Sequence, residues 1–160
     1  MTPSVLVIGI GNEFRGDDAI GLLAARDLDA MRFPGVRVVE SRGDGARLMR
    51  LWKSFPTVML IDAVHSGSPP GTLHRLDASQ NPIPASFLCT SSHQFGVAEA
   101  VETARSLAEL PEHVIVFGVE IEHCVAGTPP ALYAKVWSAL LTALRAELSS
   151  LDPAATASFR

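Results

Sequence analysis

Three continuous apolar runs constrain the fold of this sequence more than any other feature. Residues 5–10, 58–61 and 114–119 contain only apolar side chains and glycine. A strand that is buried on both faces has such a run, whereas a strand with one solvated face alternates apolar and polar residues. Residues 36–39 form a fourth candidate strand. The runs therefore predict a parallel sheet that is covered on both sides.

Between these runs, the apolar residues follow helical spacing. Residues three and four positions apart lie on one face of a helix, so each set predicts a helix with a buried stripe. The sets are Ile20, Ala24, Leu28 and Met31; Leu48, Leu51, Trp52 and Phe55; Val97, Val101, Ala104 and Ala108; and, in a final helix at 130–148, Leu132, Val136, Leu140, Leu144 and Leu148, widened by Tyr133, Trp137 and Leu141. Right-handed crossovers place helices on both faces of the sheet. We therefore predict an α/β fold, a single three-layer α/β/α sandwich with a mostly parallel twisted sheet, over residues 1–150.

Two stretches interrupt this order of strands and helices. Residues 66–71 have the composition of a turn, and residues 72–76 after them predict a short edge strand. Residues 77–92 predict a long loop, a feature that is more often functional than incidental, with a candidate short strand at 87–90. Residues 151–160 are rich in small side chains and predict a frayed C-terminal tail.

Composition disfavours several classes of function. The 160 residues are 48% hydrophobic and 19% charged, which is enough apolar material for one substantial core. The net charge of -4 gives no support for a nucleic-acid partner, because phosphate binding requires clustered Lys and Arg. The first apolar run is far shorter than the roughly 20 residues that span a membrane, and the N-terminus has no basic leader. We expect neither membrane insertion nor export.

The cysteine content favours a reducing compartment. The sequence contains only Cys89 and Cys124, too few for a disulfide framework or a four-thiolate zinc site, and we expect both thiols to be buried. We therefore expect a cytoplasmic protein.

The loop from Gly9 to Asp18 connects the first strand to the first helix and is the leading candidate for ligand binding. Ligands of such folds bind at the carboxyl ends of parallel strands, where this loop begins. It matches a dinucleotide-binding turn only in part, since Phe14 stands where the third glycine would allow close helix–strand packing. Asp17 and Asp18 would also repel a phosphate at the start of the helix. Nucleotide binding is therefore disfavoured.

Two adjacent carboxylates are more than a helix cap requires. One of Asp17 and Asp18 can cap the helix, which leaves the other able to face the crevice. Asp62 follows the run 58–61 and is predicted at the same edge of the sheet. Its alternative role is that of a turn residue bonded to nearby backbone, and its position in the sequence does not separate the two roles.

His93 is the third candidate at this edge. We predict it in the first turn of a helix that starts near Ser92, where Ser91 and Gln94 have the spacing of a capping box. These serines are therefore expected to bond to backbone, and no nucleophile-elbow motif surrounds them. With the two aspartates, His93 completes an Asp, Asp, His set that suits a divalent metal with open coordination positions.

Five segments resemble, in order and spacing, the hydrogenase maturation protease family. They are residues 9–12 (Gly-Ile-Gly-Asn), 16–18 (Gly-Asp-Asp), 61–63 (Ile-Asp-Ala), 92–96 (Ser-His-Gln-Phe-Gly) and 118–120 (Gly-Val-Glu). The resemblance implies a cytoplasmic endopeptidase that removes a short C-terminal extension from the large subunit of a nickel–iron hydrogenase after nickel has been inserted. The large-subunit precursor would then be its partner.

The resemblance also implies roles for individual residues. Asp18, Asp62 and His93 match the family's metal-contacting positions, and Asp17 becomes a cap or supporting residue. The same three are the candidate catalytic residues, with their individual roles unassigned. We expect no permanent cofactor, because nickel held by the substrate's cysteine thiolates would be shared with these side chains. Hydrolysis would follow by polarising the scissile carbonyl or by a carboxylate activating water.

One segment departs from the family pattern. Many relatives have an Asp-Gly-Gly-Thr-like turn after the second strand, whereas residues 40–45 here read Glu-Ser-Arg-Gly-Asp-Gly. Glu40 most nearly matches the acidic position and is the candidate substrate-binding residue. Because the threonine is missing and charges are added, the family's substrate contacts do not transfer directly. The segment is a candidate for specificity toward a particular large subunit.

Three alternatives remain open. A nickel-binding protein or hydrogenase-assembly chaperone would use the same pocket without breaking a bond. A nucleotide-binding module is disfavoured by the acidic loop. An ordinary zinc peptidase would carry H-E-x-x-H, and the nearest approach, Glu122-His123, lacks the second histidine. We assign no role to His65, His74 or His113, and we expect a monomer.

Overall fold

A five-stranded sheet forms the centre of the computed structural model, which describes residues 2–12, 19–84, 87–89, 95–122 and 130–151. The strands are β1 (Val5–Ile10), β2 (Val36–Ser41), β3 (Thr57–Val64), β4 (Leu73–Asp77) and β5 (His113–Glu120). Their order in the sheet is β2-β1-β3-β5-β4. Neighbouring strands are parallel except for β4, which pairs antiparallel with β5 at one edge. The predicted sheet and edge strand are confirmed.

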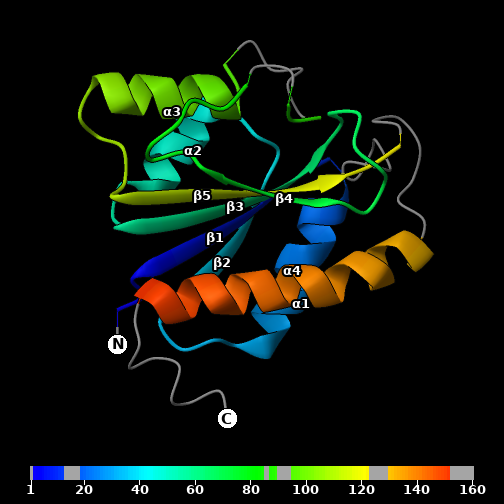
Figure 1. Cartoon of the computed structure of the whole chain (residues 1–160). Coiled ribbons are helices and arrows are strands. Elements are labelled where there is room, and N and C mark those ends of the chain that lie inside the picture. Colours follow the sequence, from blue (N-terminus) through cyan, green and yellow to red (C-terminus); the bar gives the residue numbers. More distant parts are fainter. Residues whose placement is uncertain (1, 13–18, 85–86, 90–94, 123–129, 152–160) are drawn as a thin grey trace.

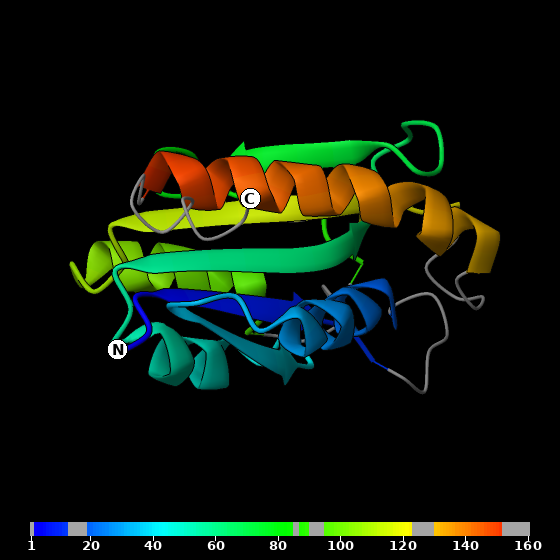
Figure 2. The same cartoon turned by 90° about the horizontal axis from the view of Figure 1, so that it is seen from below.

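Helices cover both faces of this sheet (Figure 1). The first face carries α1 (Ile20–Met31) and α4 (Pro130–Leu151), and the second carries α2 (Gly45–Trp52) and α3 (Val97–Ser106). Figure 2 shows α1 over β1 and β2, and α4 toward β4 and β5. The predicted α/β/α sandwich is confirmed. Within the described part of the chain, no helix has the length and apolar character needed to cross a membrane.

The strands are continuously apolar because each one supplies two cores. In β1, Val5 and Val7 belong to the core under α1 and α4, whereas Leu6, Ile8 and Ile10 belong to the core under α2 and α3. All six residues of this strand are buried. Complete burial of such a side chain contributes about 1.5–3 kcal/mol, so a polar residue at any of these positions would weaken one of the cores.

Two glycines set the distance between α1 and β1. A Cβ atom on Gly9 would lie 2.1 Å from the carbonyl oxygen of Gly21, and one on Gly21 would lie 2.2 Å from the carbonyl oxygen of Ile10. Both obstacles are backbone atoms, which cannot rotate away. The expectation that Phe14 argues against close helix–strand packing is therefore wrong, because Gly21 allows that packing from within the helix.

The boundary of β3 differs from the predicted one. The strand continues to Val64 because residues beyond Ile61 keep their pairing with β5. Asp62 consequently lies inside a strand and does not follow one. The alternative interpretation of Asp62 as a turn residue is therefore wrong about the turn, but the predicted bond to nearby backbone is present, from the N–H of Ala63.

The start of α3 also differs from the prediction. The helix begins at Val97, not near Ser92, and the backbone N–H of its N-cap residue Gly96 donates to Glu99 Oε2 at 3.1 Å. Glu99 thus satisfies one of the donors that the end of the helix leaves without a helical partner. Ser91 and Gln94, the predicted capping pair, lie outside the described residues.

Smaller predictions met mixed outcomes. Met31 is 40% exposed, so it does not belong to the buried stripe of α1. In the described part of the predicted strand 87–90, Leu88 forms only an isolated bridge with Val64. The last helix continues to Leu151, and the predicted frayed tail and domain boundary stay predictions because residues 152–160 lie outside the described part.

Replacing Gly9 by Ala is expected to destabilise the fold by about 3 kcal/mol or more, because the added methyl group meets backbone with no room to move. Gly35→Ala is the matched control, since nothing lies within 4 Å of its Cβ position and only its φ of +72° opposes a side chain. That strain costs about 1–2 kcal/mol. Urea unfolding of both variants measures the difference, and equal losses would contradict the role of Gly9 in helix packing.

Candidate functional site

The candidate site lies at the carboxyl ends of β1 and β3. In the sheet, β2 and β3 are the two neighbours of β1. The chain passes from β1 through α1 to β2 and then through α2 to β3, and α1 and α2 lie on opposite faces of the sheet. Such a switch point opens a crevice in which α/β proteins bind their ligands. Of the predicted metal set, only Asp62 is among the described residues. Asp18 and His93 lie outside them, as does Asp17.

Asp62 is a carboxylate inside a buried strand. Its exposed fraction is 0%, and its Oδ1 accepts a hydrogen bond from the backbone N–H of Ala63 at 2.8 Å. Its neighbours along the strand, Leu60 and Val64, face α2 and α3, so strand alternation directs Asp62 to the same side. Burial of an ionised carboxylate costs several kcal/mol before compensating contacts are counted. Its position at the switch point therefore favours a functional role over a purely stabilising one.

Backbone hydrogen bonds hold described residues next to the two loops that carry the other candidates. Gly11, just after β1, donates its N–H to the carbonyl of Ser41 at 3.0 Å. Cys89 donates its N–H to the carbonyl of Ala63, also at 3.0 Å, which places it beside the strand segment that contains Asp62. The described ends of both loops are thus held at the same edge of the sheet.

The metal set itself stays a prediction. Among the described residues, no three His, Cys, Asp or Glu side chains are grouped so that they could hold a metal ion. Cys89 is half-buried and disulfide-bonded, so the expectation of a buried thiol is wrong for this residue.

A second buried carboxylate, Glu120, ends β5 and is 1% exposed. Its oxygens accept hydrogen bonds from the backbone N–H and hydroxyl of Ser66, both at 2.7 Å, and from the N–H of Gly67 at 3.0 Å. His74 Nε2 lies 2.9 Å from Oε2 and donates the fourth bond. Burial acts to raise the pKa of Glu120, but these donors outweigh it and hold the pKa below its ordinary value. Glu120 thereby fixes the turn between β3 and β4.

The cluster of Ser66, His74 and Glu120 is not a nucleophilic triad. In such a triad the serine hydroxyl donates to the imidazole, and the acid holds the opposite ring nitrogen. Here the hydroxyl donates to Glu120 at 2.7 Å and lies 3.5 Å from His74 Nε2, the same nitrogen that bonds the carboxylate. No role was predicted for His74 from the sequence, and the family-like segment 118–120 was the only sequence signal for Glu120.

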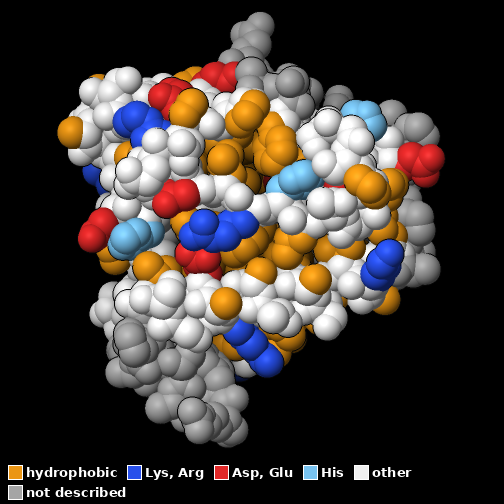
Figure 3. All heavy atoms as spheres, in the orientation of Figure 1, with side chains coloured by type: hydrophobic (Ala, Val, Ile, Leu, Met, Phe, Trp, Pro, Cys, Tyr) orange, Lys and Arg blue, Asp and Glu red, His pale blue; other side chains and the backbone are white. Residues whose placement is uncertain are grey.

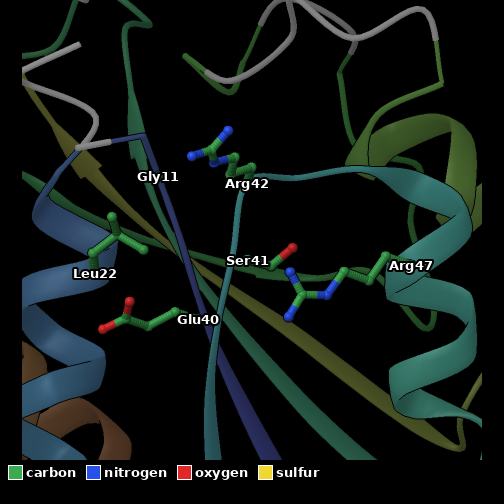
Figure 4. Close-up of a pocket in the computed structure, with 6 residues that line it drawn as sticks. All are labelled: Gly11, Leu22, Glu40, Ser41, Arg42 and Arg47. Carbon is green, nitrogen blue, oxygen red and sulfur yellow. The ribbon is translucent and has the colours of Figure 1, made fainter. Parts of the chain in front are cut away.

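Glu40, the candidate substrate-binding residue, lies at the edge of a cavity of about 260 Å³ (Figure 4). Its carboxylate accepts two hydrogen bonds from the guanidinium of Arg26 on α1, at 2.6 and 3.2 Å. The ion pair is partly exposed, so it contributes little to stability. It nevertheless engages the carboxylate that was expected to meet the substrate. The cavity is lined by Gly11, Leu22, Glu40, Ser41, Arg42 and Arg47.

The sequence matches the family model of the hydrogenase maturation proteases over residues 23–148. It is 29% identical over 120 residues to the hydrogenase expression/formation protein HupD of Thiocapsa roseopersicina, a match that covers 74% of this chain and 54% of HupD. It is also 29% identical over 122 residues to HoxM of Azotobacter vinelandii, covering 75% of this chain and 59% of HoxM. The matches therefore span less than two thirds of the length of these relatives.

Solved structures share the fold. An endopeptidase from Escherichia coli superposes with a TM-score of 0.71 at 26% identity, over 92% of this chain and 94% of that protein. The hydrogenase maturating endopeptidase HybD from the same organism gives a TM-score of 0.65 at 25% identity, with the same coverage. The sequence comparisons and the structure comparisons thus point to the same family of proteins.

Glu120→Gln is expected to lower the free energy of unfolding at pH 7 by about 1.5–3 kcal/mol, the range for hydrogen bonds to a charged group. Because the folded-state pKa is lowered, this stabilisation is complete above the unfolded value of 4.5 and is lost as the pH falls through the folded value. The difference between wild type and variant should therefore shrink below about pH 4.5. Urea midpoints at several pH values measure it, with the exposed Glu109→Gln as control; a difference independent of pH would contradict the ionised role.

Proposed function

The chain belongs to the hydrogenase maturation protease family, and on this premise we propose that it is an endopeptidase that removes the C-terminal extension from a nickel–iron hydrogenase large-subunit precursor after nickel insertion. The family match over 23–148 and the likeness to the E. coli maturating endopeptidase support this activity. The observation that carries it is the buried Asp62 at the switch point of the sheet. A cytoplasmic location and a monomeric state belong to the same proposal.

Nickel enters this proposal as part of the substrate. The precursor would present nickel held by its own cysteine thiolates, and Asp18, Asp62 and His93 would contact the ion through open coordination positions. Carboxylate and imidazole groups are suitable ligands for such an ion. The fully buried position of Asp62 supports this role, because the ion would supply a positive charge to a carboxylate withdrawn from water. The enzyme would then act only on precursor that already carries nickel.

The chemical step is hydrolysis of one peptide bond. The residues at the switch point would orient the scissile carbonyl, whose polarisation makes it open to attack. A carboxylate of the set would remove a proton from the attacking water, and the leaving amine would take up a proton. Asp62 and Asp18 are the candidates for this base, and their individual roles are unassigned.

A non-catalytic function is the second candidate. The same residues would let a nickel-binding or hydrogenase-assembly chaperone dock on a metallated partner, and HupD and HoxM are described only as expression/formation proteins. The two functions differ in the mass of the product. A chaperone leaves the precursor at full length, whereas the endopeptidase shortens it.

Nickel-loaded precursor is expected to be cleaved by the purified protein, and nickel-free precursor to stay intact. Mass spectrometry of both after incubation measures the removed peptide directly. Equal cleavage of the two forms would reject nickel as the recognition signal while keeping the endopeptidase. A full-length precursor in both samples would instead favour the chaperone.

Asp62→Asn is expected to reduce cleavage by at least about 100-fold, the lower range for loss of a catalytic acid or base. The amide keeps the size of the side chain but neither the charge nor the basicity. The exposed Asp29→Asn on α1 is the control, and circular dichroism checks that both variants fold. His93→Ala should abolish processing as well. Undiminished cleavage by either site variant would remove that residue from the site.

A further inference from the structure

Two basic residues and one acidic residue are among the described residues that line the cavity at the carboxyl end of β2. Two arginines, one from the loop after β2 and one from α2, line it together with the hydroxyl of Ser41 (Figure 4). Glu40, the one carboxylate among the described lining residues, accepts two hydrogen bonds from Arg26, which does not belong to that lining. The other charged groups among these described lining residues are the guanidinium groups of Arg42 and Arg47.

Ser41 supplies a donor that is built into the wall. The residue is 3% exposed, and its hydroxyl oxygen accepts a hydrogen bond from the N–H of Gly43 at 3.2 Å. The hydroxyl hydrogen is left for a further bond, and no described residue accepts it. In Figure 4 the hydroxyl points into the space between the side chains of Arg42 and Arg47. A buried hydroxyl directed into a cavity in this way favours an acceptor on the ligand.

Arg47 supplies the charge. Its backbone N–H is capped by Asp44 Oδ1 at 2.9 Å, whereas within the described part of the chain no carboxylate forms an ion pair with its guanidinium. The start of its helix is held in place, because Gly45 donates its N–H to the carbonyl of Phe95 at 2.9 Å. Arginine is the side chain that best matches a carboxylate, through two parallel hydrogen bonds.

The cavity beside Ser41 on β2 and the candidate catalytic residue Asp62 on β3 lie at the same end of the sheet, separated by β1. Ser41 pairs with Ile10, and the β1–β3 pairing ends at Gly9 and Ile61, the residues directly before Ile10 and Asp62. Two strand spacings, about 10 Å, therefore separate Ser41 from Asp62, a distance that about three residues of extended peptide span. A peptide cleaved near Asp62 would thus reach the cavity within a few residues.

We propose that this cavity is an anion-binding subsite that takes a carboxylate of the peptide to be removed. The carboxylate would come from an acidic side chain within a few residues of the scissile bond or from the free C-terminus. Arg47 and Ser41 are then specificity-determining residues, in the segment where this sequence departs from the family pattern. The inference rests on the proposed endopeptidase function, since it needs a peptide at this edge.

Peptide binding tests the subsite without requiring cleavage. The probe is a fluorescent synthetic peptide with the sequence of the precursor's C-terminal extension, and fluorescence anisotropy measures its binding. Two further peptides are compared with it: one in which Asn and Gln replace Asp and Glu, and one with an amidated C-terminus. The native peptide should bind wild type about tenfold more tightly than Arg47→Gln, the loss expected for one bidentate charge pair. Ser41→Ala should weaken binding less, and Arg50→Gln, an exposed arginine of the same helix outside the cavity, should not change it.

The peptide forms identify the source of the carboxylate. If wild type and Arg47→Gln bind the peptide with Asn and Gln equally well, the carboxylate comes from an acidic side chain. If they bind the amidated peptide equally well, it comes from the C-terminus. The difference should also shrink with added salt, which a purely structural effect of Arg47→Gln would not do. Equal binding of charged and neutral peptides by wild type, or no binding of any, would overturn the subsite. Failure of the proposed function shows separately, as an uncleaved nickel-loaded precursor.

Discussion

The close contact between α1 and β1 is the constraint on which the geometry of the site depends. Gly21 packs over both central strands, because a Cβ atom there would lie 2.2 Å from the carbonyl oxygen of Ile10 and 2.5 Å from that of Ile61. Ile10 is the last residue of β1, and Ile61 is the last residue of β3 that pairs with β1. A side chain at either glycine would push the helix away from the sheet and change the mutual position of the two strand ends. The packing of one helix thus sets where β3, which carries Asp62, lies relative to the carboxyl end of β1.

Two buried carboxylates at this edge have different structural explanations. Glu120 is surrounded by four donors from the β3–β4 turn and His74, and its ionised form fixes that turn to the sheet. Its burial is therefore explained by the fold. Asp62 lies near the carboxyl end of the buried strand β3, at the switch point, where a carboxylate has a chemical use in the function we propose. The contrast shows why burial of an acidic residue does not by itself mark a catalytic one.

The cavity beside β2 lies at the same edge of the sheet, next to residues 40–45, which depart from the family pattern. Glu40 and Ser41 are adjacent in the strand, so they face opposite sides: Glu40 meets Arg26 on α1, and Ser41 faces the cavity near α2. Glu40, which most nearly matches the acidic position of the family pattern, is thereby engaged in an ion pair with Arg26. The basic residues Arg42 and Arg47, which follow it in the sequence, line the cavity.

The sequence by itself determined the layers and the strands, because apolar periodicity reports how many faces of an element are buried. It also determined the family, because the residues of each motif segment are adjacent in the sequence. The sequence also indicated Asp62 and the edge strand β4, because the apolar run before Asp62 and the turn before β4 are local features. The tertiary structure decided which elements meet. Glu120 is satisfied by residues 54 and 46 positions away, Ser66 and His74, and no local pattern predicts such partners. The role of Gly21, the start of α3 at Val97 and the cavity between β2 and α2 likewise depend on packing between separate elements. Periodicity records that a side chain is buried, but only the folded arrangement determines what buries it.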